Sequence, residues 1–186
     1  MRIIHGKYKG FQFPNFQGSN TRPTSDLVKE SLFNSIQSFL PIENASVIDL
    51  FAGTGNIGLE CLSRGAANVL SVDHMGINIK YMQGVKKNLQ INNWEIRKND
   101  ALQFVSHNKV PAILIFADPP YDYPLIHDLV NRIISSDWFN VAHSVFILEH
   151  LDRLVFKQNN VFLNKQYGNT AFTCFASDVA LTSLKK

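Results

Sequence analysis

Apolar and polar residues repeat along this chain with two different periods. From Asp26 to Leu40 the apolar residues recur at helical spacing, so this stretch is predicted to be a helix that Pro41 ends. Residues 1–23 alternate only loosely and contain glycine at positions 6, 10 and 18, which indicates a hairpin or an arm. Thr24 follows Arg22-Pro23 and can cap the helix.

After residue 41, short apolar runs alternate with helical stretches. Strands are predicted at 46–51, 68–73, 112–117 and 144–149, with a weaker candidate at 94–98. Helices are predicted at 57–64, 76–92, about 100–107 and 123–135. Continuous apolar strands separated by helices favour a parallel sheet covered on both faces. Segments 161–168 and 170–176 meet at a Gly-Asn turn, which predicts an antiparallel hairpin on the sheet edge.

Length and composition place the chain among ordinary globular proteins. It has 186 residues, 45% of them hydrophobic and 18% charged, which is enough for one domain with its own core. Cys61 and Cys174 fit no disulfide or metal framework, and the histidines lack metal-ligand spacing, so no metal is expected. The chain has neither a signal-peptide pattern nor an apolar run of ~20 residues, so we expect a cytoplasmic protein without membrane contact.

The small positive charge is concentrated at the N-terminus. The first thirty residues hold five cations and two acids, whereas the remaining 156 hold thirteen of each sign. A basic arm on a neutral body suggests a polyanionic partner such as nucleic acid, although a plain solvated terminus would carry the same charges. We therefore divide the chain into an N-terminal nucleic-acid-binding arm and helix packed on the core, residues 1–40, and a main domain, residues 41–186.

Acidic residues stand at the predicted strand ends, where open α/β sheets bind their ligands. They are Asp49, Asp73, Asp100, Asp118 and Glu149. A single acid at such a position is often just a helix cap, but five corresponding ones suggest an acidic binding edge.

Gly53, Gly55 and Gly58 form the pattern G-x-G-x-x-G after the first strand, as in dinucleotide-binding turns. Asp49 precedes the turn, which is unfavourable for a pyrophosphate but favourable for a cationic sulfonium with an α-amino group. Asp73 lies 20 residues beyond Gly53, where an acid that binds ribose hydroxyls belongs, and it suits either cofactor.

The sequence FADPPY, residues 116–121, follows the predicted strand at 112–117. Two successive prolines force a rigid extended turn, which could be merely a stiff loop. Chemically, the Asp118 carboxylate and the Pro119 carbonyl could accept hydrogen bonds from both N–H groups of an exocyclic base amine. The lone pair of the nitrogen would then be free to react. Tyr121 could stack on an unpaired or flipped-out base.

The motifs DLFAGTGNIGLE and DPPY together resemble the amino-methyltransferases that use S-adenosylmethionine. More closely, the chain is similar to the bacterial RsmD-type ribosomal RNA methyltransferases, which form N2-methylguanine in small-subunit ribosomal RNA. The similarity includes RPTSDLVKESLFN at 22–34, DLFAGTGNIGLECLSRGA at 49–66 and KQYGNTAF at 165–172. It implies a Rossmann-like class I methyltransferase fold, with a seven-stranded, mostly parallel sheet and an antiparallel C-terminal hairpin.

The resemblance also implies roles for particular residues. The cofactor S-adenosylmethionine would be bound by Asp49, Phe51, Gly53, Gly55, Asp73 and Asp100. The target amine would be held by Asp118, Pro119, Pro120 and Tyr121. Ribosomal RNA, free or in an assembling small subunit, would be held by Arg2, Lys7, Lys9 and Arg22 of a monomeric protein.

Three alternatives stay open at this point. An NAD(P)-dependent oxidoreductase would explain the glycines and Asp73 but not Asp49 or DPPY. A non-catalytic RNA-binding module would not need Asp49, Asp118 and Tyr121 intact. A DNA adenine-N6 methyltransferase would share the chemistry, but the chain has no obvious separate DNA-reading domain.

Overall fold

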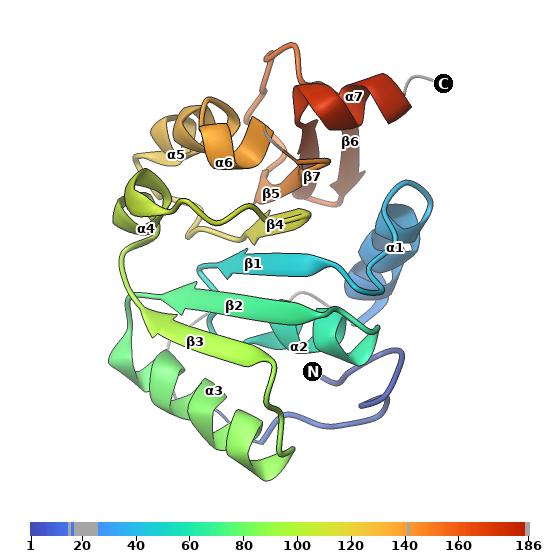
Figure 1. Cartoon of the computed structure of the whole chain (residues 1–186), viewed down its shortest axis with the longest axis vertical. Coiled ribbons are helices and arrows are strands. Elements are labelled where there is room, and N and C mark those ends of the chain that lie inside the picture. The colour runs from blue at the N-terminus through green and yellow to red at the C-terminus, as the bar shows by residue number, and fades with distance from the viewer. Residues whose placement is uncertain (15, 17–25, 141, 185–186) are drawn as a thin grey trace.

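The fold is built on one seven-stranded sheet with helices on both faces (Figure 1). The computed structural model describes residues 1–14, 16, 26–140 and 142–184. The strands follow the order β3-β2-β1-β4-β5-β7-β6 across the sheet. Their bounds are β1 (Ser46–Leu50), β2 (Asn68–Asp73), β3 (Trp94–Lys98), β4 (Leu114–Ala117), β5 (Val145–Leu151), β6 (Val161–Tyr167) and β7 (Thr170–Ala176).

The first five strands are parallel and the last two form an antiparallel hairpin. β1 is central and pairs with β2 and β4, so that Asp49 lies opposite Ser71 on one side and Phe116 on the other. β7 inserts antiparallel between β5 and β6, which leaves β6 at the edge. The predicted seven-stranded, mostly parallel sheet with a C-terminal hairpin is confirmed.

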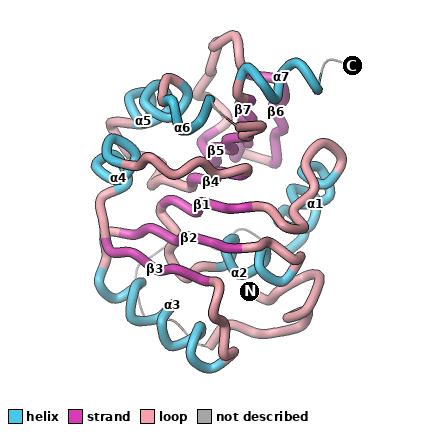
Figure 2. Tube along the Cα trace, in the orientation of Figure 1, coloured by secondary structure: helices cyan, strands magenta, loops and turns pink. Residues whose placement is uncertain are grey.

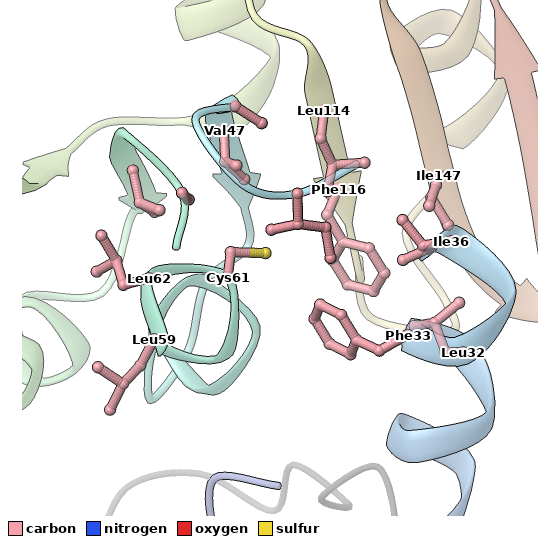
Figure 3. Close-up of a cluster of buried hydrophobic side chains, with 14 of the residues drawn as sticks. Leu32, Phe33, Ile36, Val47, Leu59, Cys61, Leu62, Leu114, Phe116 and Ile147 are labelled. Carbon is pink, nitrogen blue, oxygen red and sulfur yellow. The ribbon is translucent and has the colours of Figure 1, made fainter. Parts of the chain in front are cut away.

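Two layers of buried side chains cover the two faces of the sheet, because successive residues of a strand point to opposite sides. Val47 packs on the face that carries α1, α2 and α3, whereas Ile48 packs on the face that carries α4, α5 and α6. Figure 3 shows the first face, where Phe33 of α1 points toward Phe116 of β4. Helix bounds are α1 (Asp26–Gln37), α2 (Asn56–Ser63), α3 (Gly76–Asn88), α4 (Ala101–His107), α5 (Ile126–Ile134), α6 (Asp137–Asn140) and α7 (Asp178–Leu184). None of these described helices is long and apolar enough to cross a membrane.

The structure corrects several predicted boundaries. The helix predicted at 76–92 ends at Asn88, and the one predicted at 123–135 begins only at Ile126. The first helix ends at Gln37, three residues before Leu40, because the Ser38 hydroxyl and amide both donate to the Ser35 carbonyl oxygen in a turn. β5 continues to Leu151, so Glu149 lies inside the strand opposite Phe172 and not at its end.

The N-terminal segment is a docked hairpin that runs beside α2 (Figure 2). A single bridge joins Arg2 to Gln12, and the Lys7 amide donates to the carbonyl oxygen of Ser63, the last residue of α2, at 2.8 Å. Ile3 belongs to the same buried cluster as Val47. The N-terminal residues thus share the core of the main sheet, and the division at residue 40 stays a prediction.

Candidate active site

The turn after β1 is formed by three residues with left-handed backbone. Phe51, Gly53 and Gly55 have φ angles of +56°, +55° and +76°. Such a conformation is uncommon for a bulky residue and marks Phe51 as a strained position. A Cβ built on Gly53 would have only the Phe51 carbonyl oxygen within 4 Å, at 3.9 Å, so the backbone here borders open space among the described residues. A ligand can therefore approach the Gly53 backbone closely.

Asp49 lies under this turn and is only 2% exposed. Its Oδ2 atom accepts hydrogen bonds from the Gly58 amide at 3.1 Å and from the Ser71 hydroxyl at 3.4 Å. Burial raises the pKa of Asp49 to about 7, helped by repulsion from Asp118 and Asp73 and opposed by these two donors. The carboxyl group is thus held in place while its negative charge is disfavoured.

Asp73, at the end of β2, connects the glycine turn to α3. Its Oδ2 accepts from the Gly53 amide at 2.8 Å and from Asn78 Nδ2 at 3.0 Å, and its Oδ1 accepts from the Met75 amide at 2.8 Å. Asp100 is more distant in role, since it is exposed and caps α4 through the Gln103 amide at 2.9 Å. The observed role of Asp100 is to cap α4. The contacts of Asp73 and Asp100 with a ligand stay predictions.

Asp118 directly follows β4, the neighbour of β1. Burial raises its pKa to about 7, and its charge acts on Asp49 in turn. Pro119 is buried, whereas Pro120 is exposed and accepts a hydrogen bond from the Tyr123 amide at 2.8 Å, which closes the turn. The DPPY segment therefore has a fixed backbone at the carboxyl end of the sheet.

Aromatic rings flank this segment. Tyr121 is 46% exposed, and its hydroxyl lies 3.1 Å from the Thr170 hydroxyl at the start of β7. Tyr123 packs edge-on against Phe51 with ring centroids 5.1 Å apart, so the DPPY loop contacts the glycine turn. This arrangement leaves an accessible ring at Tyr121 that can stack on a base.

The electrostatics of this edge fit a cationic ligand. The structure brings together Asp49, Asp73 and Asp118, two of them with pKa values raised to about 7. A positive charge placed here would offset the cost of burying these carboxylates and reduce their mutual repulsion. A pyrophosphate would instead place more negative charge beside them. Among the described residues, no group of three or more His, Cys, Asp or Glu side chains is placed to hold a metal ion.

The described basic residues of the hairpin lie beside two different helices, the end of α2 and the start of α1. Lys7 and Lys9 are exposed near the C-terminus of this helix, whereas Arg2 pairs with Asp26 at 3.3 Å. Arg22 lies outside the described residues. Lys29 is completely buried, so it cannot contribute to the basic surface suggested by the charge count.

Lys29 instead belongs to a buried charge cluster of Lys29, Asn56, Glu60 and Arg64. Lys29 Nζ donates to Asn56 Oδ1 at 2.8 Å and lies 3.3 Å from Glu60 Oε2. Glu60 also accepts from Arg64 Nε at 2.8 Å and from the amides of residues 4 and 5, at 2.8 and 3.1 Å. The cluster fastens the hairpin to α1 and α2.

The sequence prediction missed Ser71 and Trp94, which lie beneath the site. Trp94 Nε1 donates to the Ser71 hydroxyl at 2.9 Å, and Ser71 in turn reaches Asp49. A signal for Ser71 existed, because it is the one hydroxyl within the apolar run VLSV beside the first strand. No comparable local signal pointed to Trp94.

Comparison with known proteins gives consistent results. A family model described as "Conserved hypothetical protein 95" matches residues 1–176. The putative rRNA methyltransferase YlbH of Bacillus subtilis is 35% identical over 162 residues, which cover 83% of this chain and 84% of that protein. The ribosomal RNA small subunit methyltransferase D of Escherichia coli K12 is 32% identical over 141 residues, covering 74% and 69%.

A solved structure shares the fold. The putative methyltransferase yhhF from Escherichia coli superposes with a TM-score of 0.83 at 27% identity, over 95% of this chain and 97% of that one. The predicted class I methyltransferase fold is therefore confirmed. By sequence and by structure, the chain belongs to the RsmD-type family of ribosomal RNA small subunit methyltransferases.

Proposed function

We propose that this protein transfers a methyl group from S-adenosylmethionine to the exocyclic N2 amine of a guanine in small-subunit ribosomal RNA. The names of its relatives support the ribosomal RNA substrate. The observation that carries the proposal is that Asp118, in the rigid DPPY turn, follows β4, and that the neighbouring strand β1 carries the buried Asp49 beneath the glycine turn. One carboxylate suits the target amine and the other suits a cationic cofactor.

The residues that would hold the cofactor are those around the glycine turn. Asp49 would neutralise the positive methionine end, Phe51, Gly53 and Gly55 would form the surface beneath it, Asp73 would bind the ribose, and Asp100 would bind the adenine amine. Bound S-adenosylmethionine supplies the methyl group as an electrophile. The raised pKa values of Asp49 and Asp118 argue against NAD(P), whose pyrophosphate would place more negative charge beside them.

The DPPY residues would prepare the amine for attack. The Asp118 carboxylate and the Pro119 carbonyl oxygen accept hydrogen bonds from its two N–H groups. This favours a tetrahedral nitrogen whose lone pair is no longer delocalised into the guanine ring. Tyr121 stacks on the flipped-out base, and the Thr170 hydroxyl fixes that ring at its far end. After transfer the nitrogen loses a proton, which Asp118 can hold because its pKa is about 7.

The RNA would lie across the carboxyl edge of the sheet and along the hairpin. Lys7, Lys9 and Arg2 would contact its phosphates, with Arg22 as a further candidate. We propose a monomer that works in the cytoplasm on free ribosomal RNA or on an assembling small subunit.

The decisive experiment supplies labelled S-adenosylmethionine and small ribosomal subunits that lack the modification. Label in N2-methylguanosine after nucleoside analysis is expected, and it should disappear with Asp118→Ala while affinity for S-adenosylhomocysteine persists. Label in adenine of duplex DNA instead, or tight NADH binding without S-adenosylhomocysteine binding, would overturn the proposal.

A further inference from the structure

A line of hydrogen bonds crosses three neighbouring strands beneath the glycine turn. The indole N–H of Trp94 on β3 donates to Ser71 Oγ on β2 at 2.9 Å, and the Ser71 hydroxyl reaches Asp49 Oδ2 on β1 at 3.4 Å. All three side chains are buried. Because an indole can only donate, it occupies an acceptor position of the Ser71 hydroxyl and leaves the Ser71 proton free to point at Asp49.

Asp49 Oδ2 has two donors of different character. The Gly58 amide, at 3.1 Å, is fixed by helix α2, whereas the Ser71 hydroxyl can rotate and its 3.4 Å distance is long for such a bond. The hydroxyl is therefore the adjustable donor, which can shorten its bond as the carboxyl group gains charge. Both donors act on the same oxygen and so fix the rotation of the carboxyl group.

The Trp94 ring also supports the turn itself. A Cβ built on Gly55 would lie 2.5 Å from Trp94 Cζ2 and 2.9 Å from Cη2, so the backbone of the turn rests on the indole. One side chain thus touches the glycine turn and, through Ser71, orients the acid beneath it. If a ligand displaced the turn, the environment of the indole ring would change.

We propose that Trp94 and Ser71 are positioning residues for the cofactor, which hold Asp49 and the Gly55 turn in the arrangement that binds it. This inference rests on the proposed function, because it assumes that Asp49 faces the cofactor. Neither residue touches the ligand. Their effect passes through the orientation of one carboxyl group and one turn.

Calorimetric titration with S-adenosylhomocysteine tests the hydrogen-bond line. Ser71→Ala should weaken binding roughly threefold to tenfold, as expected for one lost hydrogen bond, and Asp49→Asn should weaken it by on the order of tenfold to a hundredfold. Ser144→Ala is the matched control, since Ser144 is equally buried and its hydroxyl donates to the Ala112 carbonyl oxygen at 2.7 Å. Its affinity should stay within about twofold of wild type.

Trp94→Phe tests the indole, with Ser71→Ala as partner in a double-mutant cycle. Both changes act through the same hydroxyl, so their effects on affinity should be clearly less than multiplicative. Since Trp94→Phe could loosen the core, the melting temperature of each variant is recorded, and Ser71→Ala alone keeps the test valid.

Indole N–H resonances provide a signal that a purely structural role would not move. The chain has two tryptophans, and Trp138 Nε1 has no hydrogen-bond partner among the described residues, so it serves as the internal reference. Titration with S-adenosylhomocysteine should shift the Trp94 resonance and leave that of Trp138 in place. Ser71→Ala should move the Trp94 resonance in the free protein and reduce its response to ligand.

The outcomes separate the inference from the proposed function. Wild-type affinity in Ser71→Ala, with weakened binding in Asp49→Asn, would overturn the positioning role and leave the proposed function intact. Wild-type affinity in Asp49→Asn would remove Asp49 from the cofactor site and the inference with it. If the indole N–H resonance of Trp94 did not shift when S-adenosylhomocysteine is added, the positioning role would also be overturned.

Discussion

Replacement of Glu60 by glutamine should destabilise the protein more than replacement of Lys29 by methionine. Both side chains are completely buried and lie 3.3 Å apart. Glu60→Gln keeps the shape of the side chain but removes the negative charge that faces Lys29 and the 3% exposed Arg64. Lys29→Met removes one cation and leaves Glu60 with Arg64 and two backbone amides.

The expected magnitudes follow from what each change leaves behind. Glu60→Gln leaves a buried ammonium with only neutral acceptors, Asn56 Oδ1 and the Arg2 carbonyl oxygen, and breaking such a pair costs about 3–5 kcal/mol. Lys29→Met leaves a carboxylate that is still charge-paired, for which about 1–3 kcal/mol is expected. At roughly 2–4 °C per kcal/mol for a chain of this size, Glu60→Gln should lower the melting temperature by about 6–20 °C.

Thermal unfolding followed by circular dichroism at pH 7 measures both variants. Asp128→Asn is the control, because its pair with Arg132 is exposed and should contribute less than about 1 kcal/mol. If Glu60→Gln melts within about two or three degrees of wild type, or if Lys29→Met is the more destabilising change, the Glu60 carboxylate is not the centre of the buried charge cluster.

Further predictions concern the site and the RNA surface. At saturating S-adenosylmethionine, kcat/KM for the RNA should rise with pH through about 7, because Asp118 must ionise to accept the amine, and Asp118→Asn should lower kcat by on the order of 10²-fold and remove this rise. Asp49→Asn should gain stability relative to wild type as pH increases from 4 to 8. The folded-state pKa of Asp49 lies above its ordinary value, so ionisation between about 4 and 7 costs the wild type stability that the amide retains, and a constant difference in melting temperature across this range would contradict that pKa. Gly53→Ala should weaken S-adenosylhomocysteine binding while the fold persists, since the new Cβ enters open space at a left-handed position; unchanged affinity would place the ligand elsewhere. Reversal of Lys7 and Lys9 to glutamate should weaken RNA binding and flatten its salt dependence, and an unchanged salt slope would exclude these lysines from the RNA surface.

The architecture was predictable because its strands are continuous apolar runs. LIFA in β4 and VFIL in β5 are apolar at every position, which is typical of strands in a sheet covered on both faces. The short helix α6 was missed because four residues, DWFN, are too few to show a helical period. The early end of α1 depends on the Ser38–Ser35 turn, which competes with a helical pattern that itself continues to Leu40.

The candidate site was predictable in its order but not in its bonding. The positions of Asp49, Asp73 and Asp118 follow from the strand pattern alone. Two hydrogen bonds depend on which strands become neighbours: the Gly53 amide donates to Asp73, and the Ser71 hydroxyl donates to Asp49. No local sequence pattern predicts which strands pair. The raised pKa values also depend on the assembled fold, because burial raises both, and the acids Asp118 and Asp73 add to the effect at Asp49.

The count of N-terminal charges was a poor predictor of the basic surface, because it included Lys29, which is buried. The helical pattern of α1 already indicated that burial. Lys29 precedes Leu32 by three residues and Phe33 by four, so it occupies the same buried face of α1. With Lys29 inside and Arg2 paired to Asp26, the exposed cations of the hairpin tip are Lys7 and Lys9, beside Ser63 at the far end of α2. An eight-residue helix is about 12 Å long. Asp118 lies beside the carboxyl end of β1, from which the chain leads into the start of α2. An RNA that touches both these lysines and Asp118 would therefore extend over roughly that distance, or about three to four base steps of ~3.4 Å. The hairpin can thus strengthen binding of a structured RNA without contacting the target base, whose selection is left to the DPPY edge.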